Sequence, residues 1–238
     1  MSMTREDILR ELELLPEWKL CAQPAAAEKH EKAISLEGAP TFPPGATIES
    51  MDWQALQACV KSCQACGLVR TRTQTVFGVG DENADWLIVG EAPGAEEDKR
   101  GEPFVGQAGK LLDNMLAAID LRRGENVYIA NVLKCRPPEN RDPHGEEVMQ
   151  CSPYLKRQVE LIKPKLILAL GKFAAQTLLN SDATVTSLRG KLHQYHGVPV
   201  IVTYHPAYLL RNLADKAKAW DDLCLAKSTM AKISESGL

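Results

Sequence analysis

Residues Trp86 to Gly94 read WLIVGEAPG, and this stretch decides the fold. Its first four residues form a short apolar run that ends at a glycine, which predicts a strand buried on both faces. Two glycines and a proline then surround the Glu91 carboxylate, so the chain leaves the strand through a rigid turn. The turn lacks the signatures of a P-loop and of a dinucleotide-binding loop. An ordinary strand-to-helix turn and a ligand-binding turn both stay open.

The rest of the chain alternates short apolar runs with amphipathic segments. Further strands are expected at residues 127–132, 166–170, 193–195 and 198–203. Helices are expected at residues 52–61, 107–119, 146–162 (with a kink or restart at Pro153), 172–179 and 213–233. This alternation predicts a parallel sheet with helices on both faces. Such sheets bind ligands at the carboxyl ends of their strands, which singles out the loops after Val89, Ala130 and Val202.

The composition is that of a globular protein. Of the 238 residues, 45% are apolar and 25% are charged, and no run of about 18 apolar residues predicts a transmembrane helix. The acidic, periodic start of the chain is unlike a signal peptide, so a cytoplasmic location is expected. The net charge of −3 gives no overall sign of a nucleic-acid partner.

The acidity is concentrated at the N-terminus, where residues 1–50 hold 5 Lys/Arg and 9 Asp/Glu. Residues 4–20 have the periodicity of an amphipathic helix, and residues 21–50 have the Pro/Ala-rich composition of a linker. The chain is therefore expected to divide into an N-terminal arm, residues 1–50, and a compact domain, residues 51–238.

Seven cysteines are many for a reduced compartment, where clustered cysteines indicate metal binding or catalysis. Cys63 and Cys66 form a C-x2-C pair; 68 residues separate Cys66 from Cys135, and 15 separate Cys135 from Cys151. Four thiolates suit either tetrahedral zinc or a [4Fe–4S] cluster, and ordinary buried cysteines are the alternative. Outside this group lie Cys21, Cys59 and Cys224.

Two further residues stand out near the first two strand ends. Phe104 lies between a proline and two glycines, where it could stack on a base or plug the end of the sheet. Asn131 lies inside an apolar strand, and a buried amide must find hydrogen-bond partners. Its donor and acceptor could match a pyrimidine edge, or could bond a neighbouring loop.

The last strand leads into His205, whose backbone is held extended by the proline that follows. His205 is either a ligand-facing group or a strand-end histidine with a satisfied ring. Residues 207–210 are mostly apolar and are expected on a loop, where they could act as a wedge between bases. A local phosphate-binding face could be made by Arg70, Arg72, Lys134, Arg136, Arg141 and Arg211.

Taken in order, these motifs resemble family 4 uracil-DNA glycosylases, the iron–sulfur type, from about Cys63 to Trp220. The matching segments are Gly90–Gly94, Pro103–Gly106, Asn131 with Lys134–Pro138, His205-Pro206 and the four spaced cysteines. The resemblance implies a three-layer α/β/α sandwich around a mainly parallel four-stranded sheet. It also implies hydrolysis of the N-glycosidic bond of uracil in DNA, leaving an abasic site, and a structural [4Fe–4S] cluster on Cys63, Cys66, Cys135 and Cys151.

The resemblance also implies roles for single residues. Glu91 and His205 would be catalytic: Glu91 would stabilise the cationic sugar or orient water, and His205 would bond the uracil O2. Gly90, Ala92, Phe104 and Asn131 would bind the extruded base. A wedge segment would fill the gap that the extruded base leaves in the DNA, with Leu209 as its main residue. This segment consists of Ala207, Tyr208, Leu209, Leu210 and Arg211.

The implied partner is single- or double-stranded DNA containing uracil, bound by a monomer, with no membrane involved. An N-terminal arm that docks on another protein is one role considered for residues 1–50. A non-catalytic or covalently trapping uracil-DNA-binding protein is the alternative function. The basic inserted loop typical of the trapping branch is absent between Cys135 and Cys151, so turnover is expected.

Overall fold

A computed structural model describes residues 47–235 of the chain. The helix expected at residues 4–20 and nearly all of the linker expected at 21–50 lie outside the described residues. Of the expected linker, Ile48–Ser50 forms a short 3-10 turn, η1. The Glu49 carboxylate of this turn pairs with Lys156 at 3.3 Å. The division of the chain at residue 50 stays a prediction.

The centre of the fold is a sheet in the order β1-β3-β2-β4-β6-β5. Its strands are β1 (Val79–Gly80), β2 (Trp86–Gly90), β3 (Val127–Asn131), β4 (Leu166–Leu170), β5 (Leu192–Tyr195) and β6 (Val198–Thr203). The four inner strands are parallel, and the two edge strands pair antiparallel. The mainly parallel sheet is therefore confirmed, but it has six strands rather than four, because β5 extends one edge and the unpredicted β1 extends the other.

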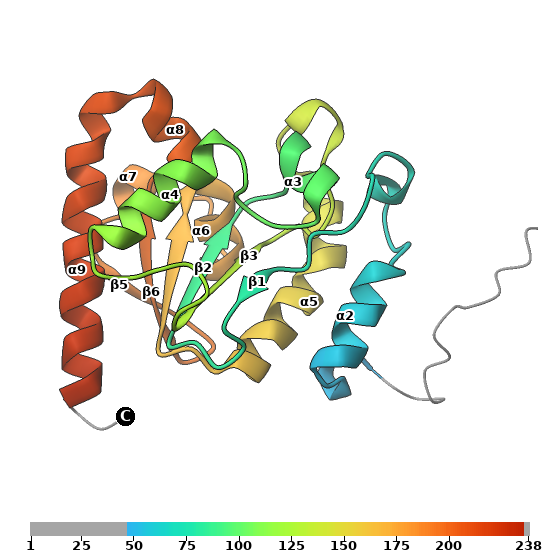
Figure 1. Ribbon diagram of the computed structural model, residues 1–238, viewed down its shortest axis with the longest axis horizontal. Coiled ribbons are helices and arrows are strands. Elements are labelled where there is room, and N and C mark those ends of the chain that lie inside the picture. The colour runs from blue at the N-terminus through green and yellow to red at the C-terminus, as the bar shows by residue number, and fades with distance from the viewer. Residues whose placement is uncertain (1–46, 236–238) are drawn as a thin grey trace, which may run out of the picture. The chain divides into compact units, whose positions relative to one another are not determined.

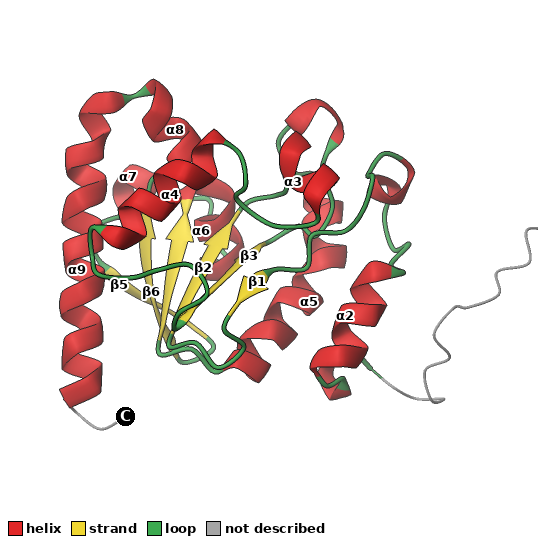
Figure 2. Ribbon diagram, in the orientation of Figure 1, coloured by secondary structure: helices red, strands yellow, loops and turns green. Residues whose placement is uncertain are grey.

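Helices cover both faces of the sheet, as Figures 1 and 2 show. The longer described helices are α2 (Trp53–Lys61), α4 (Gln107–Ala117), α5 (Gly145–Ile162), α6 (Gly171–Leu179) and α9 (Lys216–Glu235). Shorter ones are η2 (Gly67–Arg70), α3 (Ala95–Arg100), η3 (Pro138–Asn140), α7 (Val185–Leu188), α8 (Pro206–Arg211) and η4 (Leu213–Asp215). None of these helices has the length and apolarity that crossing a membrane requires.

Alternating strand residues point into two separate cores. In β2, Leu87 and Val89 pack in the core that includes residues of α2, α5 and α6. Trp86 and Ile88 pack in the core that includes residues of α4, α8 and α9. Every residue of the three parallel strands β2, β3 and β4 is buried, because helices cover each face of the sheet. The three-layer sandwich follows from this double burial.

Two local expectations need correction. The expectation of a loop over residues 207–210 is wrong, because Pro206–Arg211 forms the helix α8, whose first position suits a proline. The expected restart at Pro153 is absent, since α5 runs through it as one helix of 18 residues. A kink at Pro153, the other form of that expectation, is compatible with the continuity of this helix.

The close packing of α4 on the loop before it gives a stability prediction. A Cβ atom at Gly109 would overlap the backbone carbonyl of Phe104. We expect Gly109→Ala to lower the free energy of unfolding by about 1–3 kcal/mol, as overpacking does. Gly145→Ala, where a Cβ meets nothing within 4 Å, is the control and should not destabilise. Urea denaturation of both variants measures this, and equal midpoints would contradict the packing argument.

Candidate active site

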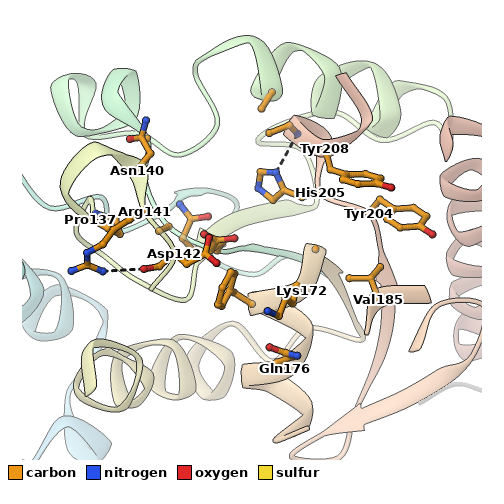
Figure 3. Close-up of a pocket in the computed structure, with 18 of the residues that line it drawn as sticks. Pro137, Asn140, Arg141, Asp142, Lys172, Gln176, Val185, Tyr204, His205 and Tyr208 are labelled. Atoms are coloured by element: carbon orange, nitrogen blue, oxygen red, sulfur yellow. Dashed lines mark hydrogen bonds between the residues drawn. The ribbon is translucent and has the colours of Figure 1, made fainter. Parts of the chain in front are cut away.

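A cleft of about 990 Å³ opens at the carboxyl ends of the parallel strands. Among the predicted site residues it is lined by Glu91, Ala92, Phe104, Asn131, His205, Ala207, Tyr208 and Arg211. Figure 3 shows Asp142, Lys172 and His205 around the same hollow. Residues up to 120 positions apart in the sequence therefore meet at one edge of the sheet, as the strand-end rule predicts.

Gly90, Phe104 and Asn131 lie close together at the carboxyl ends of β2 and β3, and Phe104 and Asn131 line the cleft. A Cβ atom at Gly90 would overlap Asn131 Oδ1 and would lie 2.5 Å from Phe104 Cζ. The absence of a side chain at Gly90 therefore allows the amide and the ring to approach one another at the end of β2. This contact is one that local sequence patterns do not reveal.

The side-chain amide of Asn131 is buried, with only 2% of the residue exposed. Within residues 47–235 nothing donates a hydrogen bond to its Oδ1 atom. An unsatisfied buried acceptor is costly, and it is commonly satisfied by a ligand or an ordered water. The position of Asn131 at the cleft makes its Oδ1 suited to a ligand that presents an N–H group.

Phe104 is held in a left-handed backbone conformation, with φ of 55°. Such a conformation is unfavourable for a bulky residue, so surrounding contacts must maintain it. Arg123 donates to the carbonyls of Pro103 and Phe104, each at 2.9 Å. The Glu97 carboxylate accepts from the backbone N–H groups of the next two residues at 2.9 and 3.0 Å. The backbone around Phe104 is thus held from two sides by charged side chains.

His205 caps the N-terminus of α8 through its Nδ1 atom, which accepts from the backbone N–H of Ala207 at 3.2 Å. An accepting Nδ1 leaves the proton of the neutral ring on Nε2. Burial, together with the positive charge of Arg211, lowers the pKa of His205 to about 4. The imidazole is therefore neutral at pH 7 and has one N–H to donate. Its ring lies 5.5 Å from that of Phe104, tilted by 30°.

The pKa of Glu91 is shifted in the opposite direction from that of His205. Burial and the negative charge of Asp142 raise the pKa of its carboxyl to about 7, while Lys172 acts to lower it. The carboxyl is therefore close to half-ionised at neutral pH, which is typical of groups that move or stabilise charge in a reaction. Neither Asp142 nor Lys172 was expected here. Lys172 follows the end of β4, so applying the strand-end rule to that strand as well would have found it.

The wedge residues do not all face the cleft. Leu209, expected to be foremost, is only 1% exposed and packs in the core between α4 and α9, so that expectation is wrong. Leu210 is 43% exposed on the same helix. Tyr208 donates to Asp215 at 2.7 Å and stacks on Tyr204 at 5.1 Å.

The expected phosphate-binding face is also only partly present. Arg141 and Arg211 line the cleft, and Arg141 is held by Glu147 through two hydrogen bonds of 2.9 and 2.5 Å. The prediction that Lys134 binds phosphate is wrong, because its side chain is buried. Arg72 donates to Cys135 Sγ at 2.9 Å instead of facing the cleft. Sequence proximity therefore grouped side chains that the fold directs to different places.

The four spaced cysteines come together around one small, almost wholly apolar cavity. It is lined by Cys63, Cys66, Cys135 and Cys151, whereas Cys59 and Cys224 lie outside it. As the side chains stand, no three His, Cys, Asp or Glu groups in the described part of the chain form a ready set of metal ligands. The donor chemistry nonetheless fits a cluster: four thiols share a cavity, and Arg72 and the backbone N–H of Lys134 donate to two of the sulfurs.

Burial acts on two of these thiols, those of Cys135 and Cys151. It raises the pKa of Cys151 to about 12, although the positive charge of Lys134 and the backbone N–H bond act to lower it. The same cause raises the pKa of Cys135, against the hydrogen bond from Arg72. Thiolate ligands in this apolar cavity therefore depend on positive charge brought to them, which is what a bound metal centre supplies.

The fold and the cleft together define an α/β protein that gathers an amide, an aromatic ring and a neutral histidine in one cleft at the carboxyl ends of its parallel strands. The chain belongs to the uracil DNA glycosylase superfamily, whose sequence model matches residues 77–224. It is 53% identical over 159 residues to a type-4 uracil-DNA glycosylase of Archaeoglobus fulgidus, covering 63% of this chain and 79% of that protein. A type-4 enzyme of Pyrobaculum aerophilum is 43% identical over 74% of this chain and 93% of its own length.

The environment of Glu91 yields a prediction about its titration. Asp142→Asn removes a negative neighbour and should lower the pKa of Glu91 below the value of about 7, whereas Lys172→Met should raise it. Asp182→Asn makes the same charge change in a residue of the same cleft that does not act on Glu91, and should leave the pKa unchanged. Infrared difference spectra with labelled glutamate follow the carboxyl directly. A titration insensitive to Asp142 would contradict the assigned cause.

Proposed function

We propose that this protein removes uracil from DNA by hydrolysing the N-glycosidic bond, leaving an abasic site. The observation that carries the proposal is the buried Oδ1 of Asn131, which receives no hydrogen bond from residues 47–235 and lies in the same cleft as Phe104 and His205. Uracil presents an N3–H donor with a carbonyl on either side, which complements the Asn131 acceptor and nearby donors. Cytosine has an acceptor at N3, so the same amide would disfavour it. The names of the relatives agree with this substrate.

Phe104 and Asn131 would bind the base once it has left the stack. The ring of Phe104 offers a flat face for the uracil, and the amide of Asn131 would donate from Nδ2 to O4 while accepting from N3–H. Gly90 and Ala92 would allow the base to approach the backbone at the end of β2. Leu210, rather than Leu209, would occupy the space left in the DNA.

His205 and Glu91 would carry the bond cleavage. Negative charge grows on the uracil O2 as the glycosidic bond breaks, and the Nε2–H of a neutral His205 would donate to it. The Glu91 carboxylate would stabilise the positive charge that develops on the sugar or orient the attacking water. Because the pKa of Glu91 is about 7 and that of His205 about 4, activity would fall on the acidic side as Glu91 is protonated, while the His205 ring stays largely neutral.

Cys63, Cys66, Cys135 and Cys151 would hold a [4Fe–4S] cluster. When bound, the cluster supplies a covalent cross-link between the segment after α2, the turn after β3 and the helix α5. A cytoplasmic location, a monomeric state and a docking role for residues 1–50 stay predictions.

Uracil excision is the direct test. DNA containing one uracil, single- or double-stranded, should be cut by alkali after incubation with the protein. Strands that stay intact at high enzyme concentration would refute the glycosylase activity and favour a non-catalytic or trapping uracil-DNA-binding protein.

Asn131→Asp should lower uracil excision about 100-fold, because it removes the donor to O4 and leaves a carboxylate facing that carbonyl. Asn114→Asp, an exposed site on α4, is the control and should act like the wild type.

Arg123 gives a test of how Phe104 is positioned. Arg123→Gln weakens the hold on the Pro103 and Phe104 carbonyls, and we expect kcat/KM for uracil excision to fall about tenfold. In a Phe104→Ala background the same change should have little further effect. Arg122→Gln, in an exposed pair with Glu125, is the control. Full additivity of the two changes would contradict the positioning role.

The cluster has its own test. Protein purified without oxygen should be brown and contain about four irons per chain. Cys135→Ala should lower the iron content and the unfolding midpoint together, since it removes a cross-link between distant segments. Cys224→Ala, on the exposed side of α9, should change neither. A colourless protein with one zinc would refute the cluster.

A further inference from the structure

Lys134 is the most unusual side chain in the described part of the chain. It lies in the turn between β3 and Cys135, it is only 1% exposed, and it heads the fully buried side chains by volume. Lysine is almost never fully buried unless it is paired, because transferring an ammonium out of water is very costly. Its position therefore requires a specific set of partners.

The contacts of Lys134 reach two places at once. Its Nζ atom donates to the backbone carbonyl of Asn131 at 2.8 Å and to Gln158 Oε1 at 2.6 Å. Its backbone N–H donates to Cys151 Sγ at 3.2 Å. One residue thus contacts the residue whose amide faces the cleft and a cysteine of the metal-binding cavity.

The partners of the ammonium are neutral, so its charge needs a counterpart elsewhere. No carboxylate of residues 47–235 forms an ion pair with Lys134. Its neighbours in the cysteine cavity are Cys151, whose Sγ accepts from the Lys134 backbone N–H, and Cys135, the next residue in the chain; all three line that cavity. Four thiolates around a [4Fe–4S] core leave a net charge of about −2, which would balance a buried cation.

We propose that Lys134 is a positioning residue that couples the cysteine cavity to uracil recognition. The cluster ligands compensate the buried charge of Lys134, and Lys134 holds the carbonyl of Asn131, so that the Asn131 amide stays at the bottom of the cleft. The inference rests on the proposed function and adds to the cluster a role in base selection besides cross-linking.

Gln158 completes the arrangement from the side of α5. Its Oε1 accepts from Lys134, and its Nε2 donates to the carbonyl of Phe77 at 3.0 Å. The network is buried throughout, and satisfied buried networks restrict the conformations available to their members. Changes at Lys134 should therefore appear as a loss of base recognition rather than as a general loss of DNA binding.

The test uses Lys134→Met, which keeps an unbranched side chain, one heavy atom shorter, and removes its charge and donors. Two affinities are measured: for DNA with 2′-fluoro-2′-deoxyuridine, a uracil nucleotide that resists cleavage, and for DNA with a tetrahydrofuran abasic analogue. Their ratio isolates recognition of the base. We expect the ratio to fall at least tenfold in Lys134→Met, with about four irons per chain retained.

Arg72→Gln is the matched control. It removes a cationic side chain that donates to Cys135 Sγ and to the carbonyl of Cys63, and that has no hydrogen bond to Asn131. It should alter the visible absorption of the cluster and leave the affinity ratio unchanged. A ratio that falls equally in Arg72→Gln and Lys134→Met would overturn the specific role of Lys134.

A second variant guards against misfolding of the first. Gln158→Met removes one acceptor of Lys134 and leaves the lysine in place, and we expect a severalfold fall in the ratio with normal iron content. A wild-type ratio in an iron-loaded Lys134→Met or Gln158→Met protein overturns the proposal. Failure of the wild-type protein to excise uracil would refute the proposed function instead, so the two outcomes are distinguishable.

Discussion

The structure depends on one constraint: the parallel strands β2, β3 and β4 are buried on both faces. A strand in this position can carry almost no polar side chain along its length, because both of its faces pack against helices. Polar groups are therefore confined to the strand ends, where the ladder stops and loops begin. Glu91 and Asn131 lie at the ends of β2 and β3, and His205 lies just beyond the parallel strand β6, so the arrangement that builds the sheet also gathers these polar groups at one edge.

The same burial sets the charge state of the site. It raises the pKa of Glu91 and lowers that of His205, in each case by disfavouring the charged form. At neutral pH the cleft then holds a neutral imidazole that can donate a hydrogen bond and a carboxyl that is ready to ionise. Burial thus gives the Glu91 carboxyl and the His205 imidazole different charge states from those that they have in water.

Local sequence patterns predicted most of the strands and helices, but not the edge strand β1 or the orientation of the side chains on α8. Short apolar runs identified the inner strands, because a doubly buried strand has a distinctive composition. The two-residue strand β1 has no such signal, since its pairing depends on β3 alone. Leu209 and Leu210 are neighbours of the same chemical type, and only the orientation of α8 makes one a core residue and the other an exposed one.

The sequence by itself determined the fold class, the family and the residue types of the cleft, because these depend on periodicity and on motifs that are short and ordered. The tertiary structure decided which of those residues act together. The negative charge of Asp142 raises the pKa of Glu91, and Arg123 donates to the Phe104 carbonyl. Lys134 forms hydrogen bonds to both Asn131 and Cys151. These relations arise from distances and burial across the fold, and burial determines the strength of a charge or a hydrogen bond.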